Sequence, residues 1–324
     1  MATKLKFSKK IDSTVVINAK MPARRIEHKG DLELELDQLE DYCFGRKRNS
    51  LSKTTVKNYK AATKAIFNKL GYLEYSDQYV SMVRRAIEGK PSNTVFLYMT
   101  ALQELFRANY LEDYEIAKPK VTRNCTNDEN KYHKPQEIVR LFEAIGTDTL
   151  YNCRDSAIIS LLYFAALRNS EVCHLEVGDY DLENHFVTIH EHGKWHPKSY
   201  QVRKLYVPKE CHAKILAWYK VREQENITSK TLFLTSNGVP FNDLSLRNVI
   251  VRRAKDAGLK TYPHKLRHSR ATHLANGING NKPWAIGVLS KYLGHSSIST
   301  TAIYVHTSDE EQKRYLDMTK ELNV

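Results

Sequence analysis

A stretch without periodic apolar residues, at positions 115–132, divides this chain of 324 residues into two parts. The stretch is polar and contains Lys118-Pro119-Lys120, and the apolar spacing that is typical of helices is lost through it. These features are typical of a linker between domains. A chain of this length can bury two hydrophobic cores, so we expect one domain at residues 31–114 and a second at 133–324.

The first of these domains has a helical pattern. Between residues 32 and 42, and again after Ser52, apolar residues recur every three or four positions, which predicts one apolar face on each helix. Ser52 is the expected N-cap of the second helix, and two more helices are expected over residues 77–88 and after Ser92. Four lysines share the outer face of the second helix: Lys53, Lys57, Lys60 and Lys64. Such a stripe is typical of a solvated helix face and also of a DNA-binding surface.

The second domain combines helices with a small sheet. An almost continuous apolar run over Ala157–Leu167 predicts a buried helix that delivers Arg168. Alternating segments at residues 187–190 and 204–207 flank a turn at Gly193-Lys194, which predicts antiparallel strands. Further helices are expected over 212–224, 245–257 and 265–276. The predicted fold class is therefore mainly α with a small antiparallel β-sheet.

The charge balance favours a polyanionic partner. Fifty basic residues against thirty-seven acidic ones give a net charge of +13, and such an excess attracts nucleic acid. Residues 1–30 carry eight basic and two acidic side chains. This basic N-terminal arm fits both a segment that contacts DNA phosphates and a solvated, mobile terminus.

Other features limit the class of protein. The five cysteines are scattered and form no Cys-x-x-Cys pair, which argues against a disulfide framework and against a structural zinc site. No apolar run approaches the length of a membrane span, and the N-terminus lacks the apolar core of a signal peptide. We therefore expect a cytoplasmic protein without a membrane partner.

Arginine, histidine and tyrosine gather in the C-terminal part. His264 and Arg267 are three residues apart, so a helix would present both on one face. His295 follows a glycine, and Tyr304 comes nine residues after it. Arginine matches two phosphate oxygens with a fixed fork of donors, histidine can carry a proton near neutral pH, and tyrosine can become a nucleophile.

These segments resemble the catalytic boxes of the tyrosine recombinases, the phage integrase family. The resemblance rests on His264-x-x-Arg267-His268, on Leu293-Gly294-His295 and on Tyr304. Upstream, Ala166-Leu167-Arg168-Asn169-Ser170-Glu171-Val172 resembles the first arginine box of that family. The similarity is close from about residue 130 to the end and looser over residues 32–114.

The resemblance implies a set of catalytic residues: Arg168, Lys194, His264, Arg267, His295 and Tyr304. Tyr304 would attack a DNA phosphate and form a phosphotyrosyl ester, without a metal or another cofactor. Lys194 would protonate the leaving 5′-oxygen, with Lys198 as a rival because Trp195 stands where the family usually has a second glycine. Glu171 would hold an active-site group in place.

The resemblance also implies the wider architecture. Residues 31–114 would be a DNA-binding core-binding domain that uses the lysine stripe, and residues 133–324 a mixed α+β catalytic domain. The two would close on double-stranded DNA as a clamp. A C-terminal helix over residues 309–322 would dock on a neighbouring protomer. Four protomers would exchange strands between two DNA sites through a Holliday junction, with an accessory directionality factor as a further partner.

Two other functions compete with this interpretation. Six histidines suggest a metal-dependent hydrolase: His190, His192, His196, His264, His268 and His273. No carboxylate follows them at a ligand spacing, and the arginines would repel a cation. The other alternative is a DNA-binding protein that has lost catalysis, against which the intact tyrosine and arginines argue.

Overall fold

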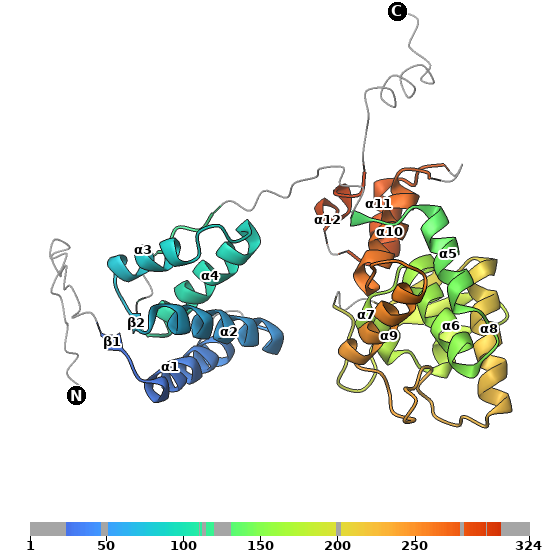
Figure 1. Cartoon of the computed structure of the whole chain (residues 1–324), viewed down its shortest axis with the longest axis horizontal. Helices are drawn as coiled ribbons and strands as arrows, with labels where there is room; N and C mark the ends of the chain where they lie inside the picture. The colour runs from blue at the N-terminus through green and yellow to red at the C-terminus, as the bar shows by residue number, and fades with distance from the viewer. Residues whose placement is uncertain are drawn as a thin grey trace, which may run out of the picture. The chain divides into compact units, whose positions relative to one another are not determined.

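The computed structural model describes residues 24–46, 51–109, 111, 115–119, 131–198, 202–278, 282–295 and 297–305. The chain forms two compact units, Met1–Asn124 and Cys125–Val324, whose boundary falls inside the stretch at 115–132. Helices dominate both units, and the strands form small antiparallel sheets, which confirms the predicted fold class (Figure 1). Most of the predicted arm and the whole predicted helix at 309–322 lie outside the described residues.

The first unit is a small helical bundle. Its helices are α1 (Lys29–Asp41), which continues into the π-helical segment η1 (Tyr42–Arg46), then α2 (Lys53–Leu70), α3 (Asp77–Ala86) and α4 (Ser92–Ala108). The Ser52 hydroxyl accepts a hydrogen bond of 3.2 Å from the Thr55 amide, so the predicted N-cap is confirmed. Helices α1, α2 and α4 pack around a buried core that includes Leu36, Leu102 and Phe106.

The described end of the predicted arm belongs to this folded unit. Strand β1 (Arg25–Ile26) pairs antiparallel with β2 (Leu73–Glu74). Arg24 lies 2.8 Å from the fully buried carboxylate of Glu35, which balances that charge. This ion pair joins the residues before α1 to the helix itself.

The second unit contains most of the helices and a three-stranded sheet. Its elements are α5 (Pro135–Ile145), α6 (Leu150–Phe164), α7 (Asn169–His174), η3 (Val177–Asp179), β3 (Tyr180–Asp181), β4 (Phe186–Ile189), β5 (Arg203–Tyr206), α8 (Lys209–Gln224), α9 (Asp243–Asp256), α10 (Pro263–Ala275), α11 (Ile286–Leu293) and α12 (Ser299–Ala302). Helix α6 is buried among its neighbours and packs chiefly on α8 and α10. No described helix is both long enough and apolar enough to span a membrane.

The sheet has the order β3-β4-β5, and both pairs are antiparallel. Val187 lies opposite Leu205, and Ile189 lies opposite Arg203. The predicted pairing of β4 with β5 is confirmed, whereas β3 was not foreseen because it is only two residues long.

The predicted helix at residues 157–167 is too long at its C-terminal end. Helix α6 stops at Phe164, and Ala166 adopts a left-handed backbone conformation with φ = 50°. The Ala166 carbonyl accepts a hydrogen bond from Arg267, and Arg168 is the extended N-cap of α7. The apolar run therefore continues past the helix, because the turn that follows is as buried as the helix itself.

Candidate active site

Two arginines from distant parts of the second unit meet at the end of α11. Arg267 lies on α10 with its side chain buried, and its two terminal nitrogens donate to the carbonyl oxygens of Ala166 and Leu293. Arg168 donates to the next carbonyl, that of Gly294, over 2.8 Å. Adjacent peptide groups thus hold the two guanidinium groups, which gives a rigid pair of positive charges.

A buried carboxylate supports this arginine pair. Glu171, only 1% exposed, accepts a hydrogen bond of 2.9 Å from Arg168. It also accepts two parallel bonds of 3.0 and 2.7 Å from Arg203 on β5. Burial alone would raise the pKa of Glu171, but the hydrogen bonds and charges of Arg203 and Arg168 lower that pKa to about 2. Glu171 therefore stays ionised near neutral pH and holds both arginines.

Gly294 allows the close packing of this cluster. Its φ of +62° lies in the left-handed region, and a Cβ atom at this position would lie 2.8 Å from Arg203 Nη1. A side chain here would therefore push Arg203 away from Glu171. The glycine ends α11 and turns the chain so that His295 follows directly beside the arginines.

His295 contacts both the arginine pair and the segment before Tyr304. Its Nε2 lies 3.3 Å from an Arg267 terminal nitrogen, and its Nδ1 lies 2.8 Å from the Thr301 hydroxyl. Burial and then the charges of Arg267, Arg168 and Arg203 lower the pKa of His295 to about 4. The ring is therefore neutral at pH 7, with Nε2 accepting from Arg267 and Nδ1 donating to Thr301.

His264 is the exposed member of the set. It lies in the first turn of α10, one turn before Arg267. Desolvation by the surrounding protein and the charges of Arg267, Arg168 and Lys198 lower the pKa of His264. An exposed imidazole beside two arginines is well placed to contact an anion bound by them.

Tyr304 follows α12 and is only 2% exposed. Its ring packs with apolar side chains of α10 and α11, and its centroid lies 4.9 Å from that of His268 and 6.2 Å from that of His295. Its backbone carbonyl accepts a hydrogen bond of 2.8 Å from Asn276. Burial raises the pKa of Tyr304, while the charges of Arg267 and Arg168 act in the opposite direction.

The two candidate lysines lie on the connection between β4 and β5. His192 and Trp195 exchange two backbone hydrogen bonds of 2.9 Å around Gly193, whose φ is +57°. This places the exposed Lys194 in the predicted turn. Lys198 is also exposed, and its charge acts on His264. Both lysines therefore remain candidates for the same role.

Arg203 is a member of the cluster that the sequence analysis missed. It precedes the predicted strand by one residue, and the alternation along β5 places it on the same face as the buried Leu205. An arginine on the inner face of a strand requires a buried anion. The alternation along the strand was the signal that could have identified Arg203, and Glu171 is the buried anion that it binds.

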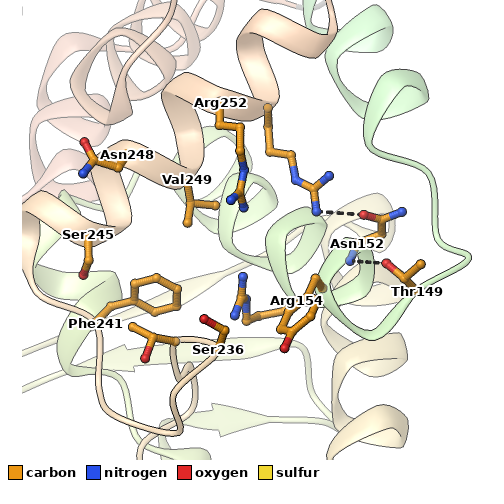
Figure 2. A pocket seen from close by; sticks show the side chains of 12 residues that line it. Thr149, Asn152, Arg154, Ser236, Phe241, Ser245, Asn248, Val249 and Arg252 are labelled. Atoms are coloured by element: carbon orange, nitrogen blue, oxygen red, sulfur yellow. Dashed lines mark hydrogen bonds between the residues drawn. The ribbon is translucent and has the colours of Figure 1, made fainter.

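A second arginine-rich site lies between α6 and α9. A pocket of about 510 Å³ is lined by polar side chains, by Arg154, Arg252 and Arg253, and by Phe241. Figure 2 shows the guanidinium groups of Arg154 and Arg252 both directed into the pocket. The buried Asp155 contacts all three arginines, at 2.7, 3.7 and 2.7 Å, so the site keeps a positive charge.

The lysine stripe of α2 divides into two pairs. Lys60 contacts Asp37 and Glu40 of α1 at 3.1 and 2.6 Å, and Lys64 contacts Glu33 at 2.7 Å. Lys53 and Lys57 are exposed, and no described carboxylate lies within ion-pair distance of either. Lys60 and Lys64 therefore pair with carboxylates of α1, whereas Lys53 and Lys57 face solvent.

The histidines of the proposed metal-dependent hydrolase do not gather in one place. His273 is buried and contacts the Tyr163 hydroxyl and the His133 carbonyl, each at 2.8 Å. His268 packs on Tyr304. His190 and His192 lie together near Asp179, in a separate cluster.

Comparison with known proteins places this chain in a family. The model of the phage integrase family matches residues 131–311. Tyrosine recombinase XerA of Thermococcus kodakarensis is 32% identical over 238 residues, which cover 72% of this chain and 77% of the relative. Tyrosine recombinase XerC of Thermodesulfovibrio yellowstonii is 29% identical over 228 residues, which cover 68% and 73%.

Solved structures share the fold at lower identity. The integrase of transposon Tn1549 in complex with transposon right-end DNA gives a TM-score of 0.66 at 20% identity, over 87% of this chain and 98% of that chain. The XerH site-specific recombinase bound to a palindromic difH substrate gives 0.62 at 21% identity, over 87% and 84%.

Neutralising Glu171 tests how strongly it holds the arginines. A carboxylate whose pKa is lowered on folding stabilises the folded state fully above its unfolded pKa, and this contribution is lost as the pH falls through the folded pKa. From a folded pKa of about 2, we expect Glu171→Gln to cost on the order of 3 kcal/mol at pH 7. The difference from wild type should narrow as the pH falls from about 4.5 towards 2.

Urea unfolding at several pH values measures this difference. All three tryptophans, Trp195, Trp218 and Trp284, lie in the second unit, so their fluorescence reports on the unit that contains Glu171. A stability difference that stays constant from pH 7 to pH 3 would contradict the assignment.

Proposed function

Because the chain belongs to the phage integrase family and is therefore a site-specific DNA recombinase, we propose that Tyr304 cuts one DNA strand and holds its 3′ end as a phosphotyrosyl ester. The observation that carries this proposal is that one segment of the chain both binds the two arginines and carries the tyrosine. The segment at residues 293–304 holds Arg168 and Arg267 through its carbonyls, and it also carries His295 and Tyr304. His295 and Tyr304 therefore lie close along the chain to the carbonyls that bind the two arginines.

In the proposed cleavage step the Tyr304 oxygen attacks phosphorus and the 5′-oxygen of the next nucleotide leaves. Arg168 and Arg267 bind the two nonbridging oxygens, on which negative charge grows in the transition state. Preorganised donors of this kind are each worth about 3–4 kcal/mol. The ester keeps the energy of the phosphodiester bond, so attack by a 5′-hydroxyl rejoins the strand without a nucleotide cofactor.

The proton of Tyr304 has to leave during attack. Burial raises the pKa of Tyr304, so the phenol is protonated in the free protein. His295 is neutral and its ring centroid lies 6.2 Å from that of Tyr304, which supports a role as the proton acceptor once Arg267 turns from its Nε2 to the phosphate. His264, exposed at the same arginines, contacts a nonbridging oxygen in this proposal.

Tyr304→Phe tests the nucleophile. The variant lacks only the hydroxyl, so we expect DNA binding to persist and the covalent protein–DNA adduct to disappear. Incubation with a nicked substrate that traps the cleaved state, followed by a denaturing gel, measures the adduct. Wild type is the positive control. An adduct of normal yield in the variant would show that another residue attacks the DNA.

The leaving 5′-oxygen needs a proton, and we propose that Lys194 supplies it from the turn between β4 and β5. Its exposed position in a tight turn supports delivery of the ammonium group to bound DNA. Lys198 remains the alternative, because its charge already acts on His264.

A substrate whose leaving oxygen is replaced by sulfur distinguishes the two lysines, because a thiolate leaves without a proton. We expect Lys194→Ala to slow cleavage of the normal substrate by a factor of about 100 or more and to cleave the sulfur substrate nearly as fast as wild type. Lys198→Ala is the matched variant. Rescue by sulfur in Lys198→Ala alone would assign the proton donor to Lys198.

We propose that DNA contacts come from both units. Lys53 and Lys57 supply exposed charges on α2, and Arg252 supplies one at the rim of the pocket between α6 and α9. The DNA in the Tn1549 and XerH structures supports such contacts, as does the net charge of +13. A DNA substrate also supports the proposal that the protein acts in the cytoplasm.

Replacing single charges tests these contacts. We expect Lys57→Ala and Arg252→Ala each to weaken DNA binding and to reduce the slope of log affinity against log salt concentration by about 1. Lys69→Ala removes the same charge from the same helix, but its ammonium group is bound to the Ala86 carbonyl. Binding titrations at several salt concentrations give the slopes. An equal loss of DNA affinity in Lys69→Ala would show that total charge matters, and not the positions of Lys57 and Arg252.

We also propose that four protomers assemble on two DNA sites and exchange strands through a Holliday junction, with an accessory directionality factor. The sequence after Tyr304 supports contact between protomers. Tyr315, Met318 and Leu322 are spaced as one apolar stripe, and the short helix that this spacing predicts would need a surface to pack on.

Truncation after Ser308 tests this assembly, because it removes the stripe and keeps Tyr304. We expect the truncated protein to bind a single site almost as well as wild type, and to lose both the complex that joins two sites and recombination. Native gel shifts with one and two sites, together with a recombination assay, measure these properties. Normal recombination after truncation would show that residues 309–324 do not link the protomers.

A further inference from the structure

We propose that Asp179, His190 and His192 form a binding site for a transition-metal ion, Zn²⁺ above all, which fixes the base of the turn that carries Lys194. Within the described residues this is the one group of histidine, cysteine and carboxylate side chains whose ligand atoms gather this closely, all within 4.8 Å of one another. The ion would be structural. The arginine pair already supplies the positive charge that cleavage requires.

The first argument is geometric. Asp179 ends η3, and the two histidines follow β4, so three ligands come from two neighbouring segments. The Nε2 atoms of His190 and His192 lie 2.7 and 2.8 Å from the two oxygens of Asp179. A zinc ion bound at about 2.0–2.2 Å from each ligand spaces tetrahedral ligands about 3.3 Å apart, so shifts of about 1 Å or less would admit it.

The second argument comes from the other nitrogen of each ring. His190 Nδ1 lies 2.9 Å from the Glu191 carbonyl, and His192 Nδ1 lies 3.5 Å from a Glu176 carboxylate oxygen. Histidines that bind metals usually donate Nδ1–H to an acceptor of this kind, which turns the Nε2 lone pair to the ion. The His190 ring is therefore already oriented as a ligand, and the Glu176 carboxylate lies near enough to orient the His192 ring after a small shift.

The ligand set and its exposure favour a transition-metal ion. Two imidazoles and one carboxylate bind Zn²⁺ and other first-row ions, and they leave a fourth position for water. The Asp179 side chain is 5% exposed, while those of His192 and His190 are 15% and 38% exposed. The carboxylate is thus held inside the protein, and an ion can enter from the histidine side.

The position of the cluster gives the ion a role. His192 pairs with Trp195 across the turn that contains Lys194, and the Trp195 ring stacks on His174 at 4.5 Å. His174 ends α7, the helix that begins after Arg168. An ion at Asp179 would therefore hold the turn against the helix that positions the first active-site arginine.

The competing explanation is a set of direct hydrogen bonds. The Nε2 atoms of His190 and His192 can each donate to Asp179, which satisfies the carboxylate without an ion. Only a direct measurement of binding separates the two.

The test uses the full chain, stripped of metal with a chelator and titrated with Zn²⁺ or Co²⁺. We expect one ion per chain, a Co²⁺ absorption spectrum typical of nitrogen and oxygen ligands, and an increase of about 5 °C or more in the melting temperature when zinc is about 100-fold above its Kd. Tryptophan fluorescence follows the melting of the second unit, which holds all three tryptophans.

Variants locate the ion. His190→Gln and Asp179→Asn should each weaken binding by a factor of about 100 or more and abolish the thermal shift. His196→Gln, a histidine in the same connection but outside the cluster, should bind like wild type. Comparing the melting of the metal-free proteins separates loss of the ion from misfolding of a variant.

Three outcomes would overturn the proposal: no saturable binding at micromolar zinc, binding that persists in His190→Gln, or equal loss in His196→Gln. The Tyr304→Phe protein should bind zinc like wild type, so the result does not depend on the proposed cleavage chemistry. Formation of the covalent adduct by metal-free wild type would support a structural role, and its complete loss below the melting temperature would contradict that role.

Discussion

The ion pairs of the buried Glu171 with Arg168 and Arg203 are the interactions on which the candidate active site depends. One carboxylate holds Arg168 from the first arginine box and Arg203 from the sheet, and so it joins α7 to β5. Removing it would leave two arginines close together without compensation. The site thus keeps an excess of positive charge because one anion organises two cations, and this excess is what a DNA phosphate would meet.

The sequence predicted the parts of the fold that follow regular spacing. The apolar periodicity located most of the helices, and the alternation around Gly193 located the pair β4 and β5. His264 and Arg267 lie on α10 as expected from a separation of three residues. Sequence spacing could not predict that Arg267 lies near Arg168. The two belong to elements about one hundred residues apart, and Arg267 reaches the first arginine box through a hydrogen bond to the Ala166 carbonyl.

Features that depend on tertiary contacts escaped the sequence analysis. The role of Arg203 follows only from its contact with Glu171, which lies thirty-two residues upstream. The lysines of α2 formed one stripe by spacing, yet packing of α1 assigns Lys60 and Lys64 to carboxylates. No carboxylate follows the histidines at a ligand spacing, whereas Asp179 precedes His190 by eleven residues. In each case the partner lies on another element.

The carbonyls of Leu293 and Gly294 carry a consequence for protein engineering. Because both acceptors are peptide groups, these two contacts to the arginine pair do not involve the side chain of Leu293. Substitutions at neighbouring exposed positions of α11, such as Val288, can alter the surface while the peptide geometry persists. Gly294 is the exception, since its missing side chain is what leaves room for Arg203. Exposed positions of α11 can therefore be varied while Gly294 is kept.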